Sequence, residues 1–433
     1  MTSGAANTAS RHARFHWLNT IWPWLCAASV ALSLLMLGAL LALLLARGLG
    51  HFWPAALEEV TLRSGETLAG EAVREVALPQ QAGTEQLYFT GNQDIEGVRW
   101  RWVAVEEIVE RAQSDDLIRL ERSPWGDFIG RLVAIEENDQ RLEGDAAWQR
   151  LTTLLALPAS QRQASDLLLT TVDGQPLRQP LANVISAQMP NAMPWWQKAT
   201  TWSSGVWRFL SEGPRAANTH GGVWPAIFGT VLMVILMSVI VTPFGVLAAI
   251  YLNEIAHQGR LTRLVRIGVR NLAGVPSIVY GVFGLGVFVY GIGGSLDEWF
   301  FSDTLPSPTF GTGGLLWASL TLALLTLPVV IVATEEGLAR IPEAQREGAV
   351  ALGATRLEML TRIVLPMAAP AMLTGVILAI ARAAGEVAPL MLVGVAKLAP
   401  QMPIDGEFPY LHLERKFMHL GYHLFDTAFH GED

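Results

Sequence analysis

Two opposite charges stand four residues apart inside a long apolar stretch. Arg382 and Glu386 interrupt residues 363–396, which are otherwise free of charge, and their spacing puts both on one face of a helix. Because charge inside a membrane is costly, the two are expected to pair and to face the protein interior. The guanidinium fork of Arg382 suits a tetrahedral oxyanion, and Glu386 would orient the fork and let the anion leave. The pattern favours an anion path, with a structural ion pair as the alternative.

A second motif precedes that stretch in a charged loop. It reads Glu347-Gly348-Ala349, then three residues, Gly353, nine residues, and Ile-Val-Leu-Pro at 363–366. A proline before the motif and Gly353 after it suit the start and the end of a short helix. The small residues of such a helix could enter a groove on a partner, and a plain connecting helix is the alternative.

Five stretches contain the roughly 20 apolar residues that a membrane span needs. They are residues 15–46, 224–252, 271–296, 304–334 and 363–396. The first follows a basic flank, as in a signal peptide, but its apolar run is longer than the core of such a peptide and no clear cleavage site follows. An uncleaved anchor is therefore the preferred interpretation.

Arginines in the short loops predict the orientation of the chain. Arginines gather in the loops after the second and the fourth span, whereas the loop after the third is acidic, and basic loops stay in the cytoplasm. The predicted order is a cytoplasmic tail at 1–20, a first transmembrane helix at 21–47, a periplasmic insert at 48–222, a transmembrane domain at 223–396 with a cytoplasmic loop at 335–366, and a periplasmic tail at 397–433.

The predicted insert carries much of the charge of the chain. Of the 30 basic and 39 acidic residues, 38 lie within 51–220, which predicts a water-soluble block within a membrane protein. Period-two patterns predict strands at 60–62 and 98–103, and a helix is expected from a cap at Asp145 to about Leu157. We therefore expect a small α+β domain. Its lack of a nucleophile–base motif, a phosphate loop and metal-ligand spacing favours a docking or spacer role.

Four tryptophans precede the second span, at 195, 196, 202 and 207. Tryptophan prefers the membrane interface, so this segment is interpreted as an amphipathic helix along the outer surface. The alternative is that these residues belong to the core of the insert.

Other features argue against several classes of function. The net charge of −9 and the absence of a basic run argue against nucleic-acid binding. The single cysteine, Cys26, excludes an intramolecular disulfide and a Cys-rich metal site. Four histidines, at 412, 419, 423 and 430, would share one face if the tail were helical. A polar face is favoured over a metal site because no motif supplies a full ligand set, and no metal is expected.

Both motifs resemble known transporter sequences. The string from Glu347 to Pro366 resembles the EAA signature of ABC importer permeases, with Gly348 where that family usually has alanine. The string around Arg382 and Glu386 is similar to that of the PstA-type permease subunit of the phosphate-specific (Pst) importer. Further matching pieces are Gly221-Gly222, Gly229-Thr230, Thr242–Gly245, Pro276–Val279 and Thr334–Glu336. The resemblance covers roughly residues 221–394.

The resemblance implies an all-α polytopic inner-membrane protein with the type I ABC importer permease fold, here with an inserted soluble α+β domain outside the membrane. It implies phosphate translocation at Arg382 and Glu386, and coupling to an ATPase through Glu347, Gly348, Ala349 and Gly353. The implied partners are a PstC-type permease, a PstB-type ATPase dimer, a PstS-type phosphate-binding protein and membrane lipid.

The resemblance also bears on catalysis and on completeness. The chain has no G-x-x-x-x-G-K-[ST] loop, so it is not expected to be an enzyme, and ATP and Mg²⁺ would bind to the partner ATPase rather than to this chain. The family has a further helix after the region that matches the tail, and the chain is expected to be truncated before it. Permeation of sulfate, molybdate or phosphonate, or a membrane-anchored sensor or scaffold, are the alternative functions.

Overall fold

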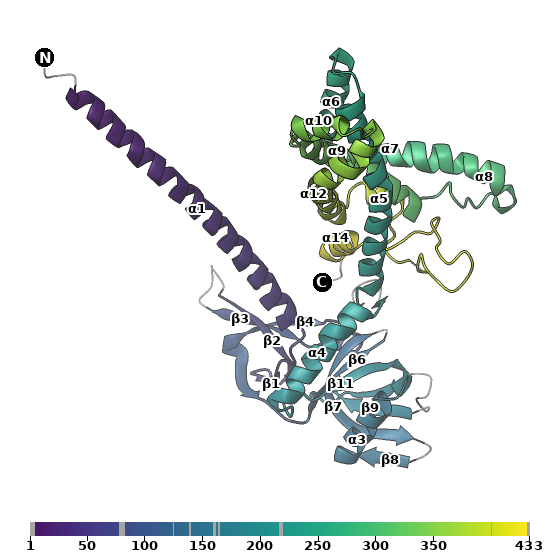
Figure 1. The fold of residues 1–433 in the computed structure, drawn as a ribbon. Helices are drawn as coiled ribbons and strands as arrows, with labels where there is room; N and C mark the ends of the chain where they lie inside the picture. The colour runs from purple at the N-terminus through teal and green to yellow at the C-terminus, as the bar shows by residue number, and fades with distance from the viewer. Residues whose placement is uncertain are drawn as a thin grey trace. The chain divides into compact units, whose positions relative to one another are not determined.

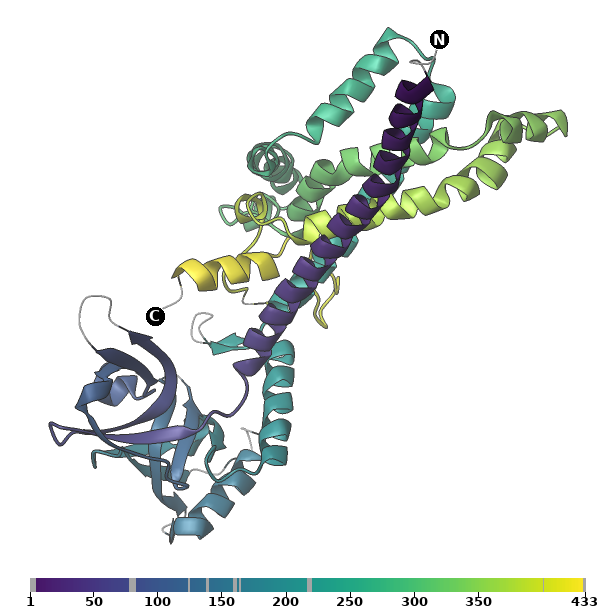
Figure 2. The same cartoon turned by 90° about the vertical axis from the view of Figure 1, so that its left-hand side faces the viewer.

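The computed structural model describes residues 5–77, 83–123, 125–137, 140–158, 162, 165–215, 220–399 and 401–430. The chain divides into two compact units, Met1–Trp207 and Arg208–Asp433, and each is described by itself. The first contains a long helix and a strand-rich domain, and the second is a bundle of helices (Figures 1 and 2).

A single helix, α1 (Ala5–Gly50), covers the first predicted span. Its segment Trp22–Gly50 has a mean hydropathy of 2.5, and none of its most apolar window is buried against the rest of the chain. Apolar side chains exposed around the whole circumference are what a helix surrounded by lipid requires.

Two antiparallel sheets form most of the insert. The first has the strand order β4-β3-β2-β1-β5. Its strands are β1 (Leu57–Leu62), β2 (Thr67–Ala77), β3 (Thr84–Phe89), β4 (Trp100–Ala104) and β5 (Ile108–Ala112). The predicted strand at 60–62 lies in β1, and most of the one at 98–103 lies in β4. Alternate residues such as Val60, Leu62 and Tyr88 point inward and are buried, as the period of two requires.

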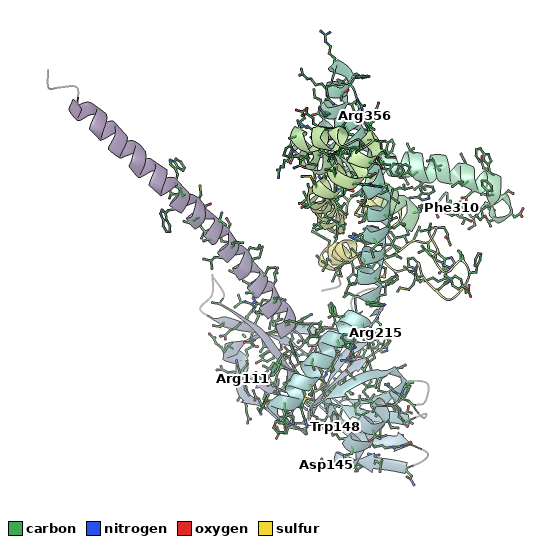
Figure 3. The ribbon with its side chains drawn as sticks, viewed as in Figure 1. Arg111, Asp145, Trp148, Arg215, Phe310 and Arg356 are labelled. Carbon is green, nitrogen blue, oxygen red and sulfur yellow. The ribbon has the colours of Figure 1, made fainter. Side chains whose placement is uncertain are left out.

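The second sheet has the order β10-β9-β7-β6-β11, and β8 pairs with β7. Its strands are β6 (Leu117–Arg122), β7 (Gly126–Glu137), β8 (Gln140–Glu143), β9 (Ser165–Thr170), β10 (Pro176–Pro180) and β11 (Val184–Gln188). One helix, α3 (Gly144–Leu155), packs on this sheet through Ala147, Leu151 and Leu154. Figure 3 labels two residues of this helix, the exposed Asp145 and Trp148, which is partly buried against the same cluster.

The charged, alternating segments of the insert pair into sheets, so its described residues are rich in strands. Helix α3, the short α2 (Gln93–Glu96) and two 3-10 turns lie between them. One prediction was wrong, because Asp145 does not cap α3. Gly144 has a φ of +60° and turns the chain directly from β8 into the helix, so Glu143 occupies the N-cap position and Asp145 lies in the first turn.

The tryptophan segment is a helix, α4 (Trp195–Ser211), as predicted. Trp195 and Trp196 are 73% and 56% exposed, which suits a membrane surface. Trp202 differs from them, because its indole Nε1 donates a hydrogen bond of 2.7 Å to the Leu49 carbonyl at the end of α1. The placement of the exposed tryptophans in the membrane interface stays a prediction.

Helices make up most of the described residues of the second unit, which also contain a short ribbon of β12 (Pro214–Arg215) and β13 (His220–Gly221). Its helices are α5 (Trp224–Ile250), α6 (Arg260–Leu272), α7 (Ser277–Phe283), α8 (Gly294–Phe300), α9 (Leu315–Ala339), α10 (Glu343–Ala351), α11 (Arg356–Met359), α12 (Leu365–Ala384), α13 (Leu390–Val393) and α14 (Leu420–His430). Three π-helical stretches, Tyr251–Ile255, Gly284–Gly293 and Leu360–Val364, extend α5, join α7 to α8 and join α11 to α12. Within the described residues, five continuous helical stretches, α1 included, are long and apolar enough to cross a membrane.

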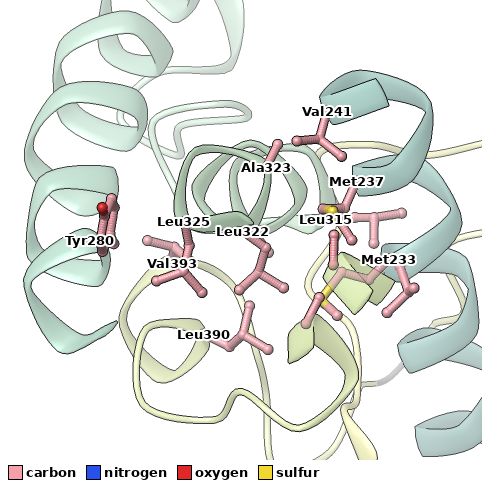
Figure 4. Packing of buried hydrophobic residues seen from close by; sticks show 14 of the residues in the cluster. Met233, Met237, Val241, Tyr280, Leu315, Leu322, Ala323, Leu325, Leu390 and Val393 are labelled. Atoms are coloured by element: carbon pink, nitrogen blue, oxygen red, sulfur yellow. The ribbon is translucent and has the colours of Figure 1, made fainter. Parts of the chain in front are cut away.

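Helix α9 is the centre of this bundle. In its most apolar window 67% of the residues are buried, against 28% for the span that begins with α5 and 22% for the span that ends with α12. Met233 and Met237 of α5 and Leu322 of α9 belong to one buried cluster, which Figure 4 shows together with Leu390 and Val393 of α13. The outer faces of α5 and α12 are therefore available to lipid or to another subunit.

The fourth span begins at Leu315 and not at residue 304, so its predicted start was wrong. Apolar composition alone does not distinguish the preceding loop, in which prolines and glycines interrupt the helix. Asp297 holds this loop in place, because its buried carboxylate accepts hydrogen bonds from the backbone N–H groups of Phe310 and Gly311 at 2.8 and 2.7 Å.

Candidate functional site

Arg382 and Glu386 meet at the end of α12. The Nε atom of Arg382 lies 3.5 Å from Oε1 of Glu386, and their side chains are 35% and 18% exposed. The helix ends at Ala384 and Gly385 follows it, so Glu386 lies just beyond the helix. The expected pair therefore forms, but the expectation of one continuous helix face was wrong. In a continued helix, Pro389 could not donate to the Gly385 carbonyl and its ring would clash with that carbonyl, which favours a break before it.

The segment after this break is fixed by close packing on both sides. A Cβ on Gly281 of α7 would lie 2.7 Å from Cα of Pro389, and a Cβ on Gly421 of α14 would lie 2.8 Å from the Val387 side chain. Glycine at 281 thus lets α7 approach the backbone of Pro389, and glycine at 421 leaves room for the Val387 side chain. The helix break that carries Glu386 is held between α7 and α14, and α13 follows it directly into the core.

The guanidinium of Arg382 has capacity for a further ligand. At 3.5 Å its contact with Glu386 is longer than the usual 2.7–2.9 Å of a charge-assisted hydrogen bond, and about a third of the side chain is exposed. Arg382 also occupies the last turn of α12, where the partial negative charge of a helix end favours a cation. A fixed positive charge with free N–H groups can bind an anion, and the neighbouring negative groups limit how tightly it binds.

The predicted coupling motif forms a short exposed helix and its stop. Helix α10 begins after Pro342, which occupies the N-cap position, and ends before Gly353. Gly353 has a φ of +90°, the left-handed conformation that favours glycine at the end of a helix. Glu347 and Gly348 are exposed, whereas Ala349 is 5% exposed and packs in a small core at the end of α9.

An open groove of about 820 Å³ borders this helix. Glu347 and Val350 of α10 line one side, Leu357 of α11 lines another, and Glu254 lies at the end of α5. Leu352, between α10 and Gly353, is 91% exposed. Exposed apolar side chains beside a groove are suited to a protein partner.

The sequence did not predict two ion pairs, one of which borders this groove. Arg346 pairs with Glu254 at 2.9 Å, and Arg266 pairs with Glu335 at 3.1 Å. In the sequence, Arg266 and Arg346 are two of the loop arginines that predict the orientation, and Glu335 lies in the Thr334–Glu336 string. Partners 92 and 69 residues apart leave no local pattern from which they could be found.

The histidines of the tail do not share one helix face, so that expectation was wrong. His412 lies in a loop and bonds to Asp405 and Glu414, each at 3.1 Å. His419 precedes α14, His423 lies within it, and the side chain of the histidine at 430 is outside the described residues. Over the described part of the chain, no group of three His, Cys, Asp or Glu side chains could hold a metal ion.

Comparison with known proteins finds relatives of the helical unit. Residues 241–405 match the family model of the binding-protein-dependent transport system inner membrane component. A probable ABC transporter permease of Bacillus subtilis, YqgH, is 34% identical over 199 residues, which are 45% of this chain and 60% of that protein.

Phosphate transport system permeases are similarly related. PstA 1 of Mycobacterium tuberculosis is 36% identical over 192 residues, 44% of this chain and 57% of that protein. PstA of Yersinia pestis is 36% identical over 189 residues, 43% of this chain and 58% of that protein. The chain thus spans roughly three fifths of the length of these relatives. Its residues 241–405 are similar to the inner-membrane components of binding-protein-dependent transport systems.

Proposed function

We propose that this chain is the transmembrane permease subunit of an ATP-driven importer that moves inorganic phosphate from the periplasm to the cytoplasm. The observation that carries the proposal is the Arg382–Glu386 pair at the end of α12, inside a domain similar to phosphate permeases. Among the described residues, Arg382 has one ion-pair contact, and it is long. A membrane-embedded arginine paired so loosely is an expensive arrangement, and an anionic substrate supplies a reason for it.

The geometry suggests how the Arg382–Glu386 pair binds and releases the anion. Phosphate would accept hydrogen bonds from the N–H groups of Arg382 that Glu386 does not engage. Glu386 and the carboxyl end of α12 would then oppose tight binding, because both carry negative charge. Entry and release at one site require such a balance.

Energy would come from a partner, because the chain has no phosphate-binding loop for ATP. Helix α10, with Glu347, Gly348 and Ala349 and its stop at Gly353, would dock in a cleft of an ATPase subunit that binds ATP and Mg²⁺. The proposed assembly contains a PstC-type second permease, two PstB-type ATPase subunits and a PstS-type binding protein. In it, the strand-rich insert would be a periplasmic docking or spacer domain.

The test is uptake of labelled phosphate at low external phosphate. The chain would be expressed with the partners encoded beside it, in cells that lack their own PstA-type subunit. We expect uptake that excess sulfate or molybdate does not reduce and that Arg382→Gln abolishes. Uptake that these oxyanions suppress would indicate another anion, and an assembled complex that moves no oxyanion would favour a sensor or scaffold.

A double variant separates an anion path from a structural ion pair. If the pair only locks the helices, Arg382→Gln with Glu386→Gln removes both charges and should recover the activity that Arg382→Gln loses. If Arg382 binds the anion, the double variant stays inactive although the complex assembles.

A further inference from the structure

One guanidinium connects three helices at the end of the bundle that carries α10. Arg346, on α10, pairs through Nη2 with Oε1 of Glu254 at 2.9 Å. The same side chain donates to the Leu338 carbonyl at 2.8 Å and to the Ile341 carbonyl at 2.7 Å. Glu254 lies in the π-helical extension of α5, the Leu338 carbonyl lies in the last turn of α9, and the Ile341 carbonyl lies in the link between α9 and α10.

A second arginine, on α6, connects the same two helix ends. Arg266 pairs through Nε with Glu335 of α9 at 3.1 Å and donates through Nη2 to the Leu252 carbonyl in the extension of α5 at 2.8 Å. Its Nη1 donates to Gln258 at 3.0 Å. Both arginines thus contact the extension of α5 and the end of α9. We call Arg266, Glu335, Arg346 and Glu254 the arginine clasp.

The clasp donates to backbone carbonyls at two helix ends, where partial negative charge favours a cation. The Leu338 carbonyl also accepts a hydrogen bond from the Ile341 N–H at 3.3 Å, and the Leu252 carbonyl accepts one from Gln258 Nε2 at 3.0 Å. The arginines therefore reinforce ends that already have donors. Glu254 and Glu335 are only 10% and 11% exposed, and Arg346 is 20% exposed. Interactions at this burial are weakly screened by salt, so the clasp can hold a defined geometry.

The clasp also lies beside the surface proposed to meet the ATPase. Glu254 and Arg346 line the open groove next to Glu347 and Val350. The covalent chain links α10 to α9 through residues 340–342, whereas α5 is distant in sequence and meets α10 through the Arg346–Glu254 pair. A displacement of α10 would therefore reach α9 through the backbone and α5 through this ion pair.

We propose that Arg346 and Arg266 are positioning residues that transmit movement of α10 to the ends of α5 and α9, and so tie ATP hydrolysis to transport. The inference rests on the proposed function, because it assigns α10 to an ATPase. It adds a residue-level route by which the helical bundle receives that movement.

The experiment compares transport with hydrolysis in the whole complex reconstituted in vesicles. The measured quantity is phosphate imported per ATP hydrolysed. We expect Arg346→Gln to lower this ratio at least fivefold while hydrolysis continues, and Glu254→Gln to lower it less, since the amide still accepts a hydrogen bond. Arg362→Gln is the matched control, because Arg362 is 78% exposed and its pair with Glu358 spans 4.0 Å. It should leave the ratio unchanged.

Two results would overturn the inference. One is an unchanged ratio in both clasp variants. The other is a parallel loss of uptake and hydrolysis that follows the amount of assembled complex, which would show a structural role only. If the unmodified complex imports no phosphate, the proposed function fails instead. The clasp is then tested by the stimulation of ATP hydrolysis by the binding protein, which Arg346→Gln should reduce and Arg362→Gln should not.

Discussion

The two glycines of the coupling motif should respond in opposite ways to alanine. Gly353 has a φ of +90°, and a Cβ there would meet nothing within 4 Å. The free-energy cost of alanine at this position is therefore backbone strain alone. That cost is about 1–2 kcal/mol, which corresponds to roughly a 5–30-fold change in an equilibrium constant. Gly348 lies inside α10 with ordinary helical backbone and also has open space around it. Alanine there should stabilise the helix by about 1 kcal/mol.

The assay is a titration of the purified ATPase subunit onto the membrane complex. If docking requires an ordered α10, Gly353→Ala should weaken binding by roughly 5–30-fold, and Gly353→Asn should weaken it less because asparagine tolerates the left-handed conformation. Gly348→Ala should leave binding unchanged or tighten it. Equal binding by Gly353→Ala and the unmodified chain would refute the argument from strain. Loss of binding in Gly348→Ala would show that the ATPase occupies the space beside Gly348.

Three further perturbations follow from particular contacts. Asp94→Asn leaves the fully buried guanidinium of Arg122 without its bidentate carboxylate and should destabilise the insert by about 3 kcal/mol, measured by pulse proteolysis in urea. Gly284→Val should reduce the yield of folded chain, because its Cβ would collide with Thr321, whereas Gly286→Val meets open space. Arg415 is the main cause that lowers the pKa of Asp405 from 3.8 to about 2. The loop should therefore be fully stabilised above pH 4 and lose that stabilisation as the pH falls toward 2, which rate-corrected hydrogen exchange would detect and Asp405→Asn would remove.

Each of these perturbations has a contrasting outcome. For the insert, the exposed pair of Arg178 and Asp166 is the control. Its removal should lower the free energy of unfolding by less than about 1 kcal/mol. An equal loss of stability at both pairs would contradict the argument from burial. Equal yields of the two glycine variants would show that the close approach in the core is not limiting. An unchanged acid response in Asp405→Asn would assign the pH dependence to another group.

Hydropathy predicts the spans well, because about 20 apolar residues are needed whatever the tertiary packing. It does not reveal where the helices break. Arg382 and Glu386 have ideal helical spacing, yet α12 ends at Ala384. Gly385 and Pro389 follow this end, and Glu386 lies outside the helix. The pair forms nonetheless, because residues on either side of a helix end remain neighbours in space.

The clasp shows the other limit of sequence reasoning. A single sequence contains no signal that Arg346 will meet Glu254 rather than the nearer acidic residues, because the choice depends on where α5 ends. That end is a π-helical stretch, a feature that single-sequence periodicity does not indicate. The long-range pairs consequently emerge only from the packed structure.

Close packing of α9 on α12 connects the clasp to the Arg382 site. Gly375 of α12 faces α9, where a Cβ would lie 2.7 Å from Cβ of Ala333, and Gly337 of α9 meets Ala371 in the same way. Close-packed interiors transmit strain, so we expect helices packed this tightly at two levels to move together. Gly375→Val should therefore separate them and lower phosphate import per ATP, whereas Gly268→Val on α6, where a Cβ has open space, should not. An assembled Gly375→Val complex with an unchanged ratio would show that movement at α10 reaches Arg382 by another route.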